Sequence, residues 1–161
     1  MTAVYRPRPG LPFTPVTIAG RKRLMWTTFT PQQIDIDVRS APGAAYLEGI
    51  LDTLAEAKVS MVRLDAVGYA IKTPGTSSFM TPETFAFIER FTARARELGM
   101  DVLVEVHAHY ESQVRIGELV DRVYDFALPR WCCTRRTPVT SARCGTGCRS
   151  AAQLRHRSRT P

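Results

Sequence analysis

The chain has 161 residues, a length that suits one domain with a hydrophobic core and excludes most large enzyme folds. Its formal net charge of +7 comes from residues 130–161, which hold eight arginines and no acidic residue. Residues 1–129 hold the other 14 basic residues and all 15 acidic ones, so the basic composition predicts no basic face on the folded part. The sequence shows no apolar leader, no 18-residue apolar stretch and no cysteine before Cys132, so we expect a cytoplasmic protein.

The first half of the chain is predicted to pass from loops to an alternation of helix and strand. Residues 1–43 are rich in proline and broken by glycine, with short extended candidates at residues 15–18 and 24–29, which predicts a loop-rich segment. Apolar residues recur at intervals of three and four over residues 44–58, the pattern of an amphipathic helix. A strand is predicted over residues 59–67, followed by a loop rich in Gly, Pro and Ser.

A second helix is predicted from residues that favour a helix start and a helix end. Thr81 can cap it, Pro82 suits its first turn and Gly99 ends it. The apolar stripe of this helix consists of Phe85, Ile88 and Phe91. Spacing of this kind is typical of a core-facing helix rather than a ligand-binding box.

The second half of the chain repeats the alternation. A strand is predicted over residues 101–107, a short helix over 111–120 and a third extended run over 122–128. Strands that alternate with helices predict βαβ units, a parallel sheet and an α/β fold. From residue 130 the pattern stops, and the Arg, Cys, Thr and Ser bias predicts a disordered basic tail over residues 130–161.

Charged residues interrupt both predicted core strands at corresponding places. Because side chains on a strand alternate between its faces, Arg63 and Asp65 share one face of the first strand, and Glu105 and His107 share one face of the second. Each strand therefore carries an acid at its C-terminal end, where functional groups collect in parallel α/β folds. One strand–helix–strand repeat separates Asp65 from Glu105, so we expect neighbouring strands to hold them side by side.

Two facing carboxylates suit the hydrolysis or transfer of a glycosyl group with retention, in which one acid is the nucleophile and the other a proton donor and then a base. Arg63 would favour the ionised form of Asp65, and the valines that flank Glu105 would favour its protonated form. These environments assign attack to Asp65 and proton donation to Glu105. The alternative is a structural Arg63–Asp65 ion pair with an unrelated acid at the end of the next strand.

Three other functional interpretations stay open from the residues alone. A zinc site is one, although the cysteine spacing matches no usual CxxC pair; its ligands would be Cys132, Cys133, Cys144, Cys148 and His156. The tail arginines could bind nucleic acid through its phosphates. Glu105, His107 and His109 alternate and could bind a metal, although such sites need further ligands from other strands.

Four stretches carry a family resemblance that covers about residues 9–129. They read FTPQQIDID, VRLDAVGYAIKTPGTSSFM, EVHAHY and DRVYDFALP. VRLDAVGY and LVEVH resemble two conserved regions of glycoside hydrolase family 13, the alpha-amylase superfamily. The four stretches, in this order, are most similar to its sucrose phosphorylase branch. The resemblance implies a (β/α)₈ TIM barrel, of which residues 44–129 would supply about three strand–helix units, and residues 1–43 resemble part of a subdomain inserted in that barrel.

The resemblance also implies roles for particular residues. Asp65 would be the nucleophile, Glu105 the acid/base and Arg63 the partner of the nucleophile. The residues expected to line the sugar and acceptor sites are Phe29, Gln33, Tyr69 and His107. The implied reaction transfers glucose from sucrose to phosphate through a covalent glucosyl-enzyme, with small-molecule partners only, no nucleic acid or membrane, and no metal or organic cofactor. Alternatives are another family 13 glycoside hydrolase or a phosphorylase of sucrose 6-phosphate or glucosylglycerate.

The chain also departs from the family pattern. The first conserved region and the later His-Asp stretch with the transition-state-stabilising aspartate are absent, and a closed barrel needs roughly 200 residues or more. We therefore expect an inactive fragment. One possible coding of the residues from Leu128 onward, with one nucleotide restored after the codon for Pro129, reads Leu-Pro-Pro-Leu-Val-Leu-His-Ala. The family tends to read Leu-Pro-Pro-Leu, then apolar residues, then His, so we interpret residues 130–161 as a frameshift product.

Overall fold

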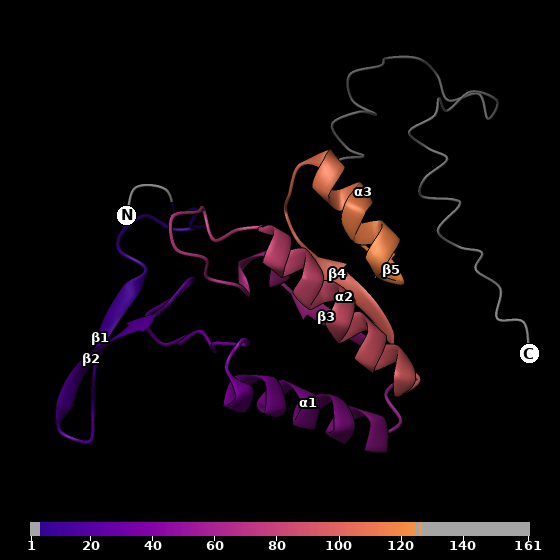
Figure 1. Ribbon diagram of the computed structural model, residues 1–161, viewed down its shortest axis with the longest axis horizontal. Coiled ribbons are helices and arrows are strands. Elements are labelled where there is room, and N and C mark those ends of the chain that lie inside the picture. Colours follow the sequence, from indigo (N-terminus) through magenta and orange to yellow (C-terminus); the bar gives the residue numbers. More distant parts are fainter. Residues whose placement is uncertain (1–3, 125, 127–161) are drawn as a thin grey trace, which may run out of the picture.

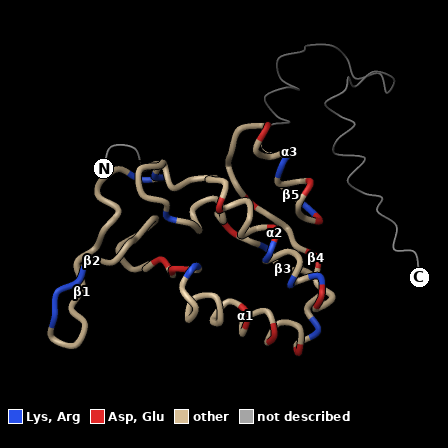
Figure 2. The backbone as a smooth tube through the Cα atoms, in the orientation of Figure 1, with Lys and Arg blue, Asp and Glu red and all other residues tan. Residues whose placement is uncertain are grey.

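The computed structural model describes residues 4–124 and residue 126, which form a two-stranded hairpin and an α/β unit (Figure 1). The predicted tail, residues 130–161, lies outside the described residues together with its four cysteines and His156. Residues 125, 127 and 128, in the third predicted extended run, also lie outside the described residues. Figure 2 shows acidic and basic positions interspersed along the α/β unit, in keeping with the nearly balanced charge of residues 1–129.

The hairpin consists of β1 (Phe13–Ile18) and β2 (Arg21–Trp26), which pair antiparallel. Its turn contains Ala19 and Gly20, both with positive φ, which a tight hairpin connection requires. The first predicted extended run lies inside β1. The second was placed at residues 24–29, and this placement is wrong, because the pairing of Ile18 with Arg21 starts the returning strand directly after the turn.

Helix α1 (Ala41–Glu56) begins three residues earlier than the predicted 44–58 and ends two residues earlier. The Oγ of Ser40 accepts a hydrogen bond from the Gly43 backbone N–H at 3.1 Å, so the cap lies outside the apolar repeat that guided the prediction. Lys58 adopts the left-handed conformation just beyond the helix end. Leu51, which is 1% exposed, anchors the helix in the core.

The α/β unit contains a parallel sheet of β3 (Met61–Asp65), β4 (Asp101–Glu105) and β5 (Arg122–Val123), in that order. The predicted parallel sheet is confirmed. The strand predicted over residues 59–67 is two residues too long at each end, because Ala66 has φ +47 and opens a 3₁₀ turn, η1 (Val67–Tyr69). The second strand ends at Glu105 rather than at residue 107.

Helix α2 (Pro82–Glu97) begins and ends where the capping residues predicted. The Oγ1 of Thr81 accepts from the Thr84 backbone N–H at 3.4 Å, Pro82 occupies the first turn, and Gly99 follows the helix with φ +81. Helix α3 (Tyr110–Leu119) begins and ends one residue before the predicted range 111–120.

The core lies on one face of the sheet. Val102, Val104 and Val106 are at most 2% exposed and belong to the same buried cluster as Ile88 of α2 and Ile116 of α3. The predicted stripe of α2 is core packing, with Phe85 and Ile88 buried and Phe91 half-buried. The other face of the sheet carries Met61, Arg63 and Asp65, all exposed. The strand alternation therefore separates a packed face from a polar face that is open to water.

Candidate functional site

The polar face of the sheet brings the two predicted acids together. Asp65 and Glu105 are the last residues of β3 and β4 and are paired with each other in the parallel register. Neighbouring strands lie about 4.8 Å apart, so the backbones that carry the two carboxyl groups are adjacent. The side chain of Asp65 is 71% exposed and that of Glu105 is 24% exposed. The expectation that neighbouring strands hold these residues side by side is confirmed.

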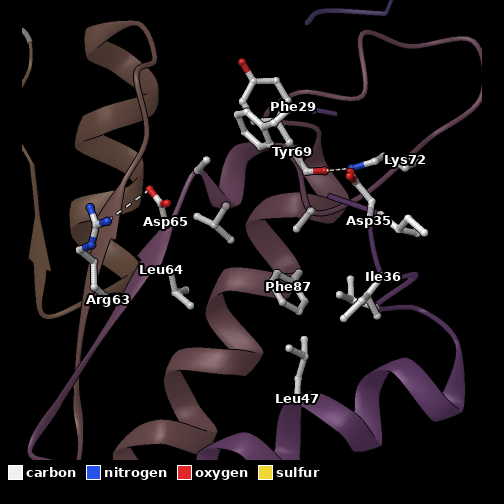
Figure 3. A pocket seen from close by; sticks show the side chains of 15 residues that line it. Phe29, Asp35, Ile36, Leu47, Arg63, Leu64, Asp65, Tyr69, Lys72 and Phe87 are labelled. Atoms are coloured by element: carbon white, nitrogen blue, oxygen red, sulfur yellow. Dashed lines mark hydrogen bonds and ion pairs between the residues drawn. The ribbon is translucent and has the colours of Figure 1, made fainter. Parts of the chain in front are cut away.

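Arg63 lies on the same face and contacts both acids. Its Nη1 donates to the Oε2 of Glu105, and its Nη2 lies 3.6 Å from the Oδ1 of Asp65. Figure 3 draws the Arg63–Asp65 pair at the end of β3. The sequence predicted Arg63 only as a partner of Asp65. In the structure the guanidinium joins the two carboxylates, and its direct hydrogen bond goes to Glu105.

The apolar surroundings predicted for Glu105 are wrong. The valines that flank it in the sequence, Val104 and Val106, point to the opposite face and are buried there at 0% and 2% exposure. Glu105 instead faces the cation of Arg63 on the open face. Side chains of consecutive residues in a strand project from opposite faces of the sheet, so the valines cannot surround the carboxyl group of Glu105.

An open hollow of about 360 Å³ lies beside Asp65 (Figure 3). We call it the Asp65 hollow. Residues from several segments line it, among them Phe29, Ile36, Leu47, Asp65, Tyr69 and Phe87. Its wall is mostly apolar, and Arg63, Asp65 and Tyr69 are among its polar lining residues. An apolar wall with a few convergent polar groups is typical of a small-molecule site.

Tyr69 and Phe29 form the aromatic end of the hollow. Their rings meet edge to face at 5.4 Å between centroids, and Phe79 packs on Tyr69 at 4.6 Å. Tyr5 stacks on Tyr69 from the N-terminal segment at 6.1 Å. Burial, together with the neighbouring Tyr5, raises the pKa of Tyr69 from the ordinary 10 to about 12.

The other two predicted site residues do not line this hollow. Gln33 is exposed, and its Oε1 accepts a hydrogen bond from the Oγ1 of Thr30 at 3.1 Å. His107 is also exposed, and its ring stacks on Phe126 with centroids 3.8 Å apart. Of the seven predicted residues, four line the hollow (Phe29, Arg63, Asp65 and Tyr69), and Glu105 is joined to them through Arg63.

Sequence reasoning missed two charged residues that also line the hollow, Asp35 and Lys72. The Nζ of Lys72 lies 2.6 Å from the Oδ2 of Asp35, and their side chains are only 20% and 17% exposed. Neither residue follows a strand pattern, and no local spacing relates them. The available signal was their place within two of the stretches that carry the family resemblance, FTPQQIDID for Asp35 and VRLDAVGYAIKTPGTSSFM for Lys72.

Among residues 4–124 and 126, no group of three or more His, Cys, Asp and Glu side chains is arranged to hold a metal ion. The alternation of Glu105, His107 and His109 that suggested one ends with the strand at Glu105, and His109 stands at the N-cap position of α3 without a side-chain capping bond. No helix in this described part is both long and apolar enough to cross a membrane.

Three known proteins that this chain resembles are all phosphorylases. The chain is 60% identical over 127 residues to sucrose phosphorylase of Agrobacterium vitis, which covers 78% of this chain and 26% of that protein. It is 54% identical over 129 residues to sucrose phosphorylase of Bifidobacterium adolescentis, with 80% and 26% covered. The crystal structure of sucrose 6F-phosphate phosphorylase from Thermoanaerobacter thermosaccharolyticum superposes with a TM-score of 0.73 at 36% identity, over 79% of this chain and 27% of that one. No protein-family model matches the chain.

The α/β unit and its carboxylate pair thus belong to a chain whose homologues are glucosyl phosphorylases. Within that class the sequence is homologous to the sucrose phosphorylases and spans about a quarter of the length of the curated relatives that it matches.

Proposed function

We propose that this chain carries the catalytic carboxylate pair of a retaining phosphorylase, with Asp65 as the nucleophile and Glu105 as the acid and then the base. The observation that carries the proposal is the pairing of these two acids at the ends of adjacent parallel strands, joined by Arg63. Adjacent strands lie about 4.8 Å apart, so side chains at paired positions can bring two carboxyl groups to the roughly 5–5.5 Å found in retaining enzymes.

The first step forms a glucosyl-enzyme. An Oδ atom of Asp65 attacks the anomeric carbon of the glucosyl unit of sucrose, and the bond to the fructosyl oxygen breaks as Glu105 gives that oxygen its proton. Arg63, in contact with both acids, stabilises the carboxylate forms that start and end this step.

The second step releases the product. A phosphate oxygen attacks the same carbon, the ester bond to Asp65 breaks, and Glu105 accepts a proton from the phosphate. Glucose 1-phosphate leaves, and both acids return to their starting forms. Phe29 and Tyr69 give the hollow beside Asp65 an aromatic end against which a sugar ring can pack. We assign Gln33 and His107 to the rim that meets the acceptor, a role that rests on the family resemblance.

The same proposal extends to the fold. The three parallel strands and their helices correspond to part of a (β/α)₈ barrel, with the polar face of the sheet turned to the barrel interior and residues 1–43 inserted before it. In this chain the Asp65 side chain is 71% exposed. A nucleophile in open water lacks the water-excluded site that retaining transfer needs, so we expect the chain by itself to be inactive.

The test measures phosphate-dependent release of glucose 1-phosphate from sucrose. It uses the full chain and a chimera in which the matched segment of this chain replaces its counterpart in the Agrobacterium vitis relative. We expect activity in the chimera only, lost on Asp65→Asn and kept on Asp52→Asn, a matched change of an exposed aspartate on α1. An active chimera that keeps its activity with Asp65→Asn would refute the assignment of the nucleophile.

Donor choice separates the proposed reaction from its neighbours. The chimera is offered sucrose, sucrose 6-phosphate and glucosylglycerate in parallel. We expect sucrose to be preferred, because the two relatives at 60% and 54% identity are both named sucrose phosphorylases. Hydrolysis of a glucoside without phosphate, at a rate equal to phosphorolysis, would instead favour a glycoside hydrolase.

A further inference from the structure

The ion pair of Asp35 and Lys72 joins two segments that are far apart in the sequence. Asp35 lies in the loop after the hairpin, and Lys72 follows the 3₁₀ turn after β3. Their side chains meet at 2.6 Å and are mostly buried, at 17% and 20% exposure. A pair removed from water in this way is weakly screened, and the loss of one partner leaves a costly charge behind.

Asp35 fixes the segment that carries Phe29. Its Oδ1 accepts from the Thr28 backbone N–H at 3.0 Å, and its Oδ2 accepts from the Thr28 hydroxyl at 2.5 Å. The backbone N–H of Asp35 donates to the carbonyl of Trp26 at 3.0 Å. These bonds close the chain between residues 26 and 35 into a loop with Phe29 inside it.

Lys72 fixes the turn that carries Tyr69. Its ammonium group donates to the backbone carbonyl of Tyr69, and it also lies 5.7 Å from the centre of the Trp26 ring. The turn depends on such support, because Ala66 opens it in the left-handed conformation, which costs free energy for a residue with a Cβ. One ammonium group thus contacts both the hairpin side and the turn.

We propose that Asp35 and Lys72 are positioning residues that hold Phe29 and Tyr69 together in the wall of the Asp65 hollow. Phe29 directly follows Thr28, the residue bound by Asp35, and the Tyr69 carbonyl is bound by Lys72. The two rings meet at 5.4 Å as a consequence, and both line the hollow with Asp65. The part of this inference that concerns the sugar rests on the proposed function.

The test uses the full chain with ¹³C-labelled tyrosine, in which Tyr69→Phe assigns the Tyr69 signal. Lys72→Met removes the ammonium group and keeps the length of the side chain, Lys72→Arg keeps the charge, and Asp35→Asn removes the charge of the partner. Lys22→Met, an exposed lysine on β2, is the matched control. Each variant is examined for the titration of Tyr69 and for ring-to-ring contacts between Phe29 and Tyr69.

In Lys72→Met and Asp35→Asn we expect the Phe29–Tyr69 contact to be lost and the pKa of Tyr69 to fall from about 12 toward 10, because the freed ring becomes solvated. Lys72→Arg and Lys22→Met should keep both signals. Asp35→Asn keeps an oxygen that can accept from Thr28, so it tests the ion pair even if Lys72→Met does not fold. An unchanged Tyr69 pKa and ring contact in a folded Asp35→Asn variant would overturn the proposal.

These readouts need no turnover, so a failure of phosphorolysis counts against the proposed function alone. In the active chimera, the same variants add a test of the link to the sugar. We expect Lys72→Met to raise the KM for sucrose several-fold while kcat changes less, with rescue by Lys72→Arg. A selective loss of kcat with an unchanged KM would overturn that link.

Discussion

The two faces of the parallel sheet have opposite properties, although they are made by alternate residues of the same strands. One face carries Val102, Val104 and Val106, which are at most 2% exposed, together with the half-buried Val62 and Leu64, and it packs against α2 and α3. The other face carries Asp65 and Glu105, each in contact with Arg63, and all three side chains are partly or largely exposed. Stability is therefore concentrated on the first face and the candidate chemistry on the second. Substitutions on the two faces should separate loss of activity from loss of folding.

The largest expected effect is on the polar face. Asp65→Asn should lower the transfer of glucose to phosphate by the chimera by at least about 10⁴-fold, because the nucleophile is removed. The same substitution in the full chain should change the free energy of unfolding by less than about 0.5 kcal/mol, because the side chain is 71% exposed. Enzyme kinetics and urea unfolding provide the two measurements. A large loss of stability would break the proposed division between the faces.

Arg63 should have the next largest effect on activity. Arg63→Met removes the cation that contacts both carboxylates, and we expect transfer by the chimera to fall about 100-fold, a size typical of losing one electrostatic contact to the reacting groups. Arg63→Lys should recover only part of this loss, because one ammonium group cannot reach two carboxylates with the geometry of a guanidinium. Full activity in Arg63→Met would show that the ion pairs are only structural.

A pair of neighbouring residues compares the faces directly. Val104→Ala removes two methyl groups from a fully buried site and should lower the free energy of unfolding by about 2 kcal/mol. Leu103→Ala, on the half-buried opposite face, removes more carbon but should cost less, because the site is already partly solvated. Urea unfolding of the full chain measures both variants. An equal or larger cost for Leu103→Ala would show that the polar face is also packed.

The N-cap of α2 should contribute less than a core methyl pair. Thr81→Ala removes the hydroxyl that accepts from the Thr84 backbone N–H, and we expect a loss of about 1 kcal/mol of stability. Thr81→Ser keeps the acceptor and serves as the control. Thermal unfolding of the two variants measures the difference, and an unchanged melting temperature in Thr81→Ala would contradict the capping role.

The smallest expected effect concerns Tyr69 at high pH. The folded pKa of about 12 lies above the ordinary value of 10, so the unfolded chain loses this proton first as the pH rises. Stability from Tyr69 is therefore fully present below pH 10 and declines between pH 10 and 12. Unfolding of the wild type and of Tyr69→Phe across this range isolates the contribution of the phenol. A parallel pH dependence in both proteins would mean that Tyr69 does not contribute.

Local rules were sufficient for most of the elements. The caps of α2 and the parallel sheet follow from residues that act on their nearest neighbours, such as Thr81 on Thr84 and Gly99 after the helix end. The start of α1 was missed, because Ser40 and Pro42 precede the apolar repeat. The end of β3 was missed because Ala66 adopts a left-handed conformation that a short apolar side chain does not announce.

The sequence by itself determined that Asp65 and Glu105 would share one face at the ends of neighbouring strands, because the alternation of side chains and the length of one βαβ repeat leave little freedom. Only the tertiary structure decided that Arg63 would contact Glu105 as well as Asp65 and that Asp35 would meet Lys72. The Arg63–Glu105 and Asp35–Lys72 contacts join segments distant in the sequence. Their partners are selected by packing and burial in three dimensions, and no periodicity along one strand or helix specifies them.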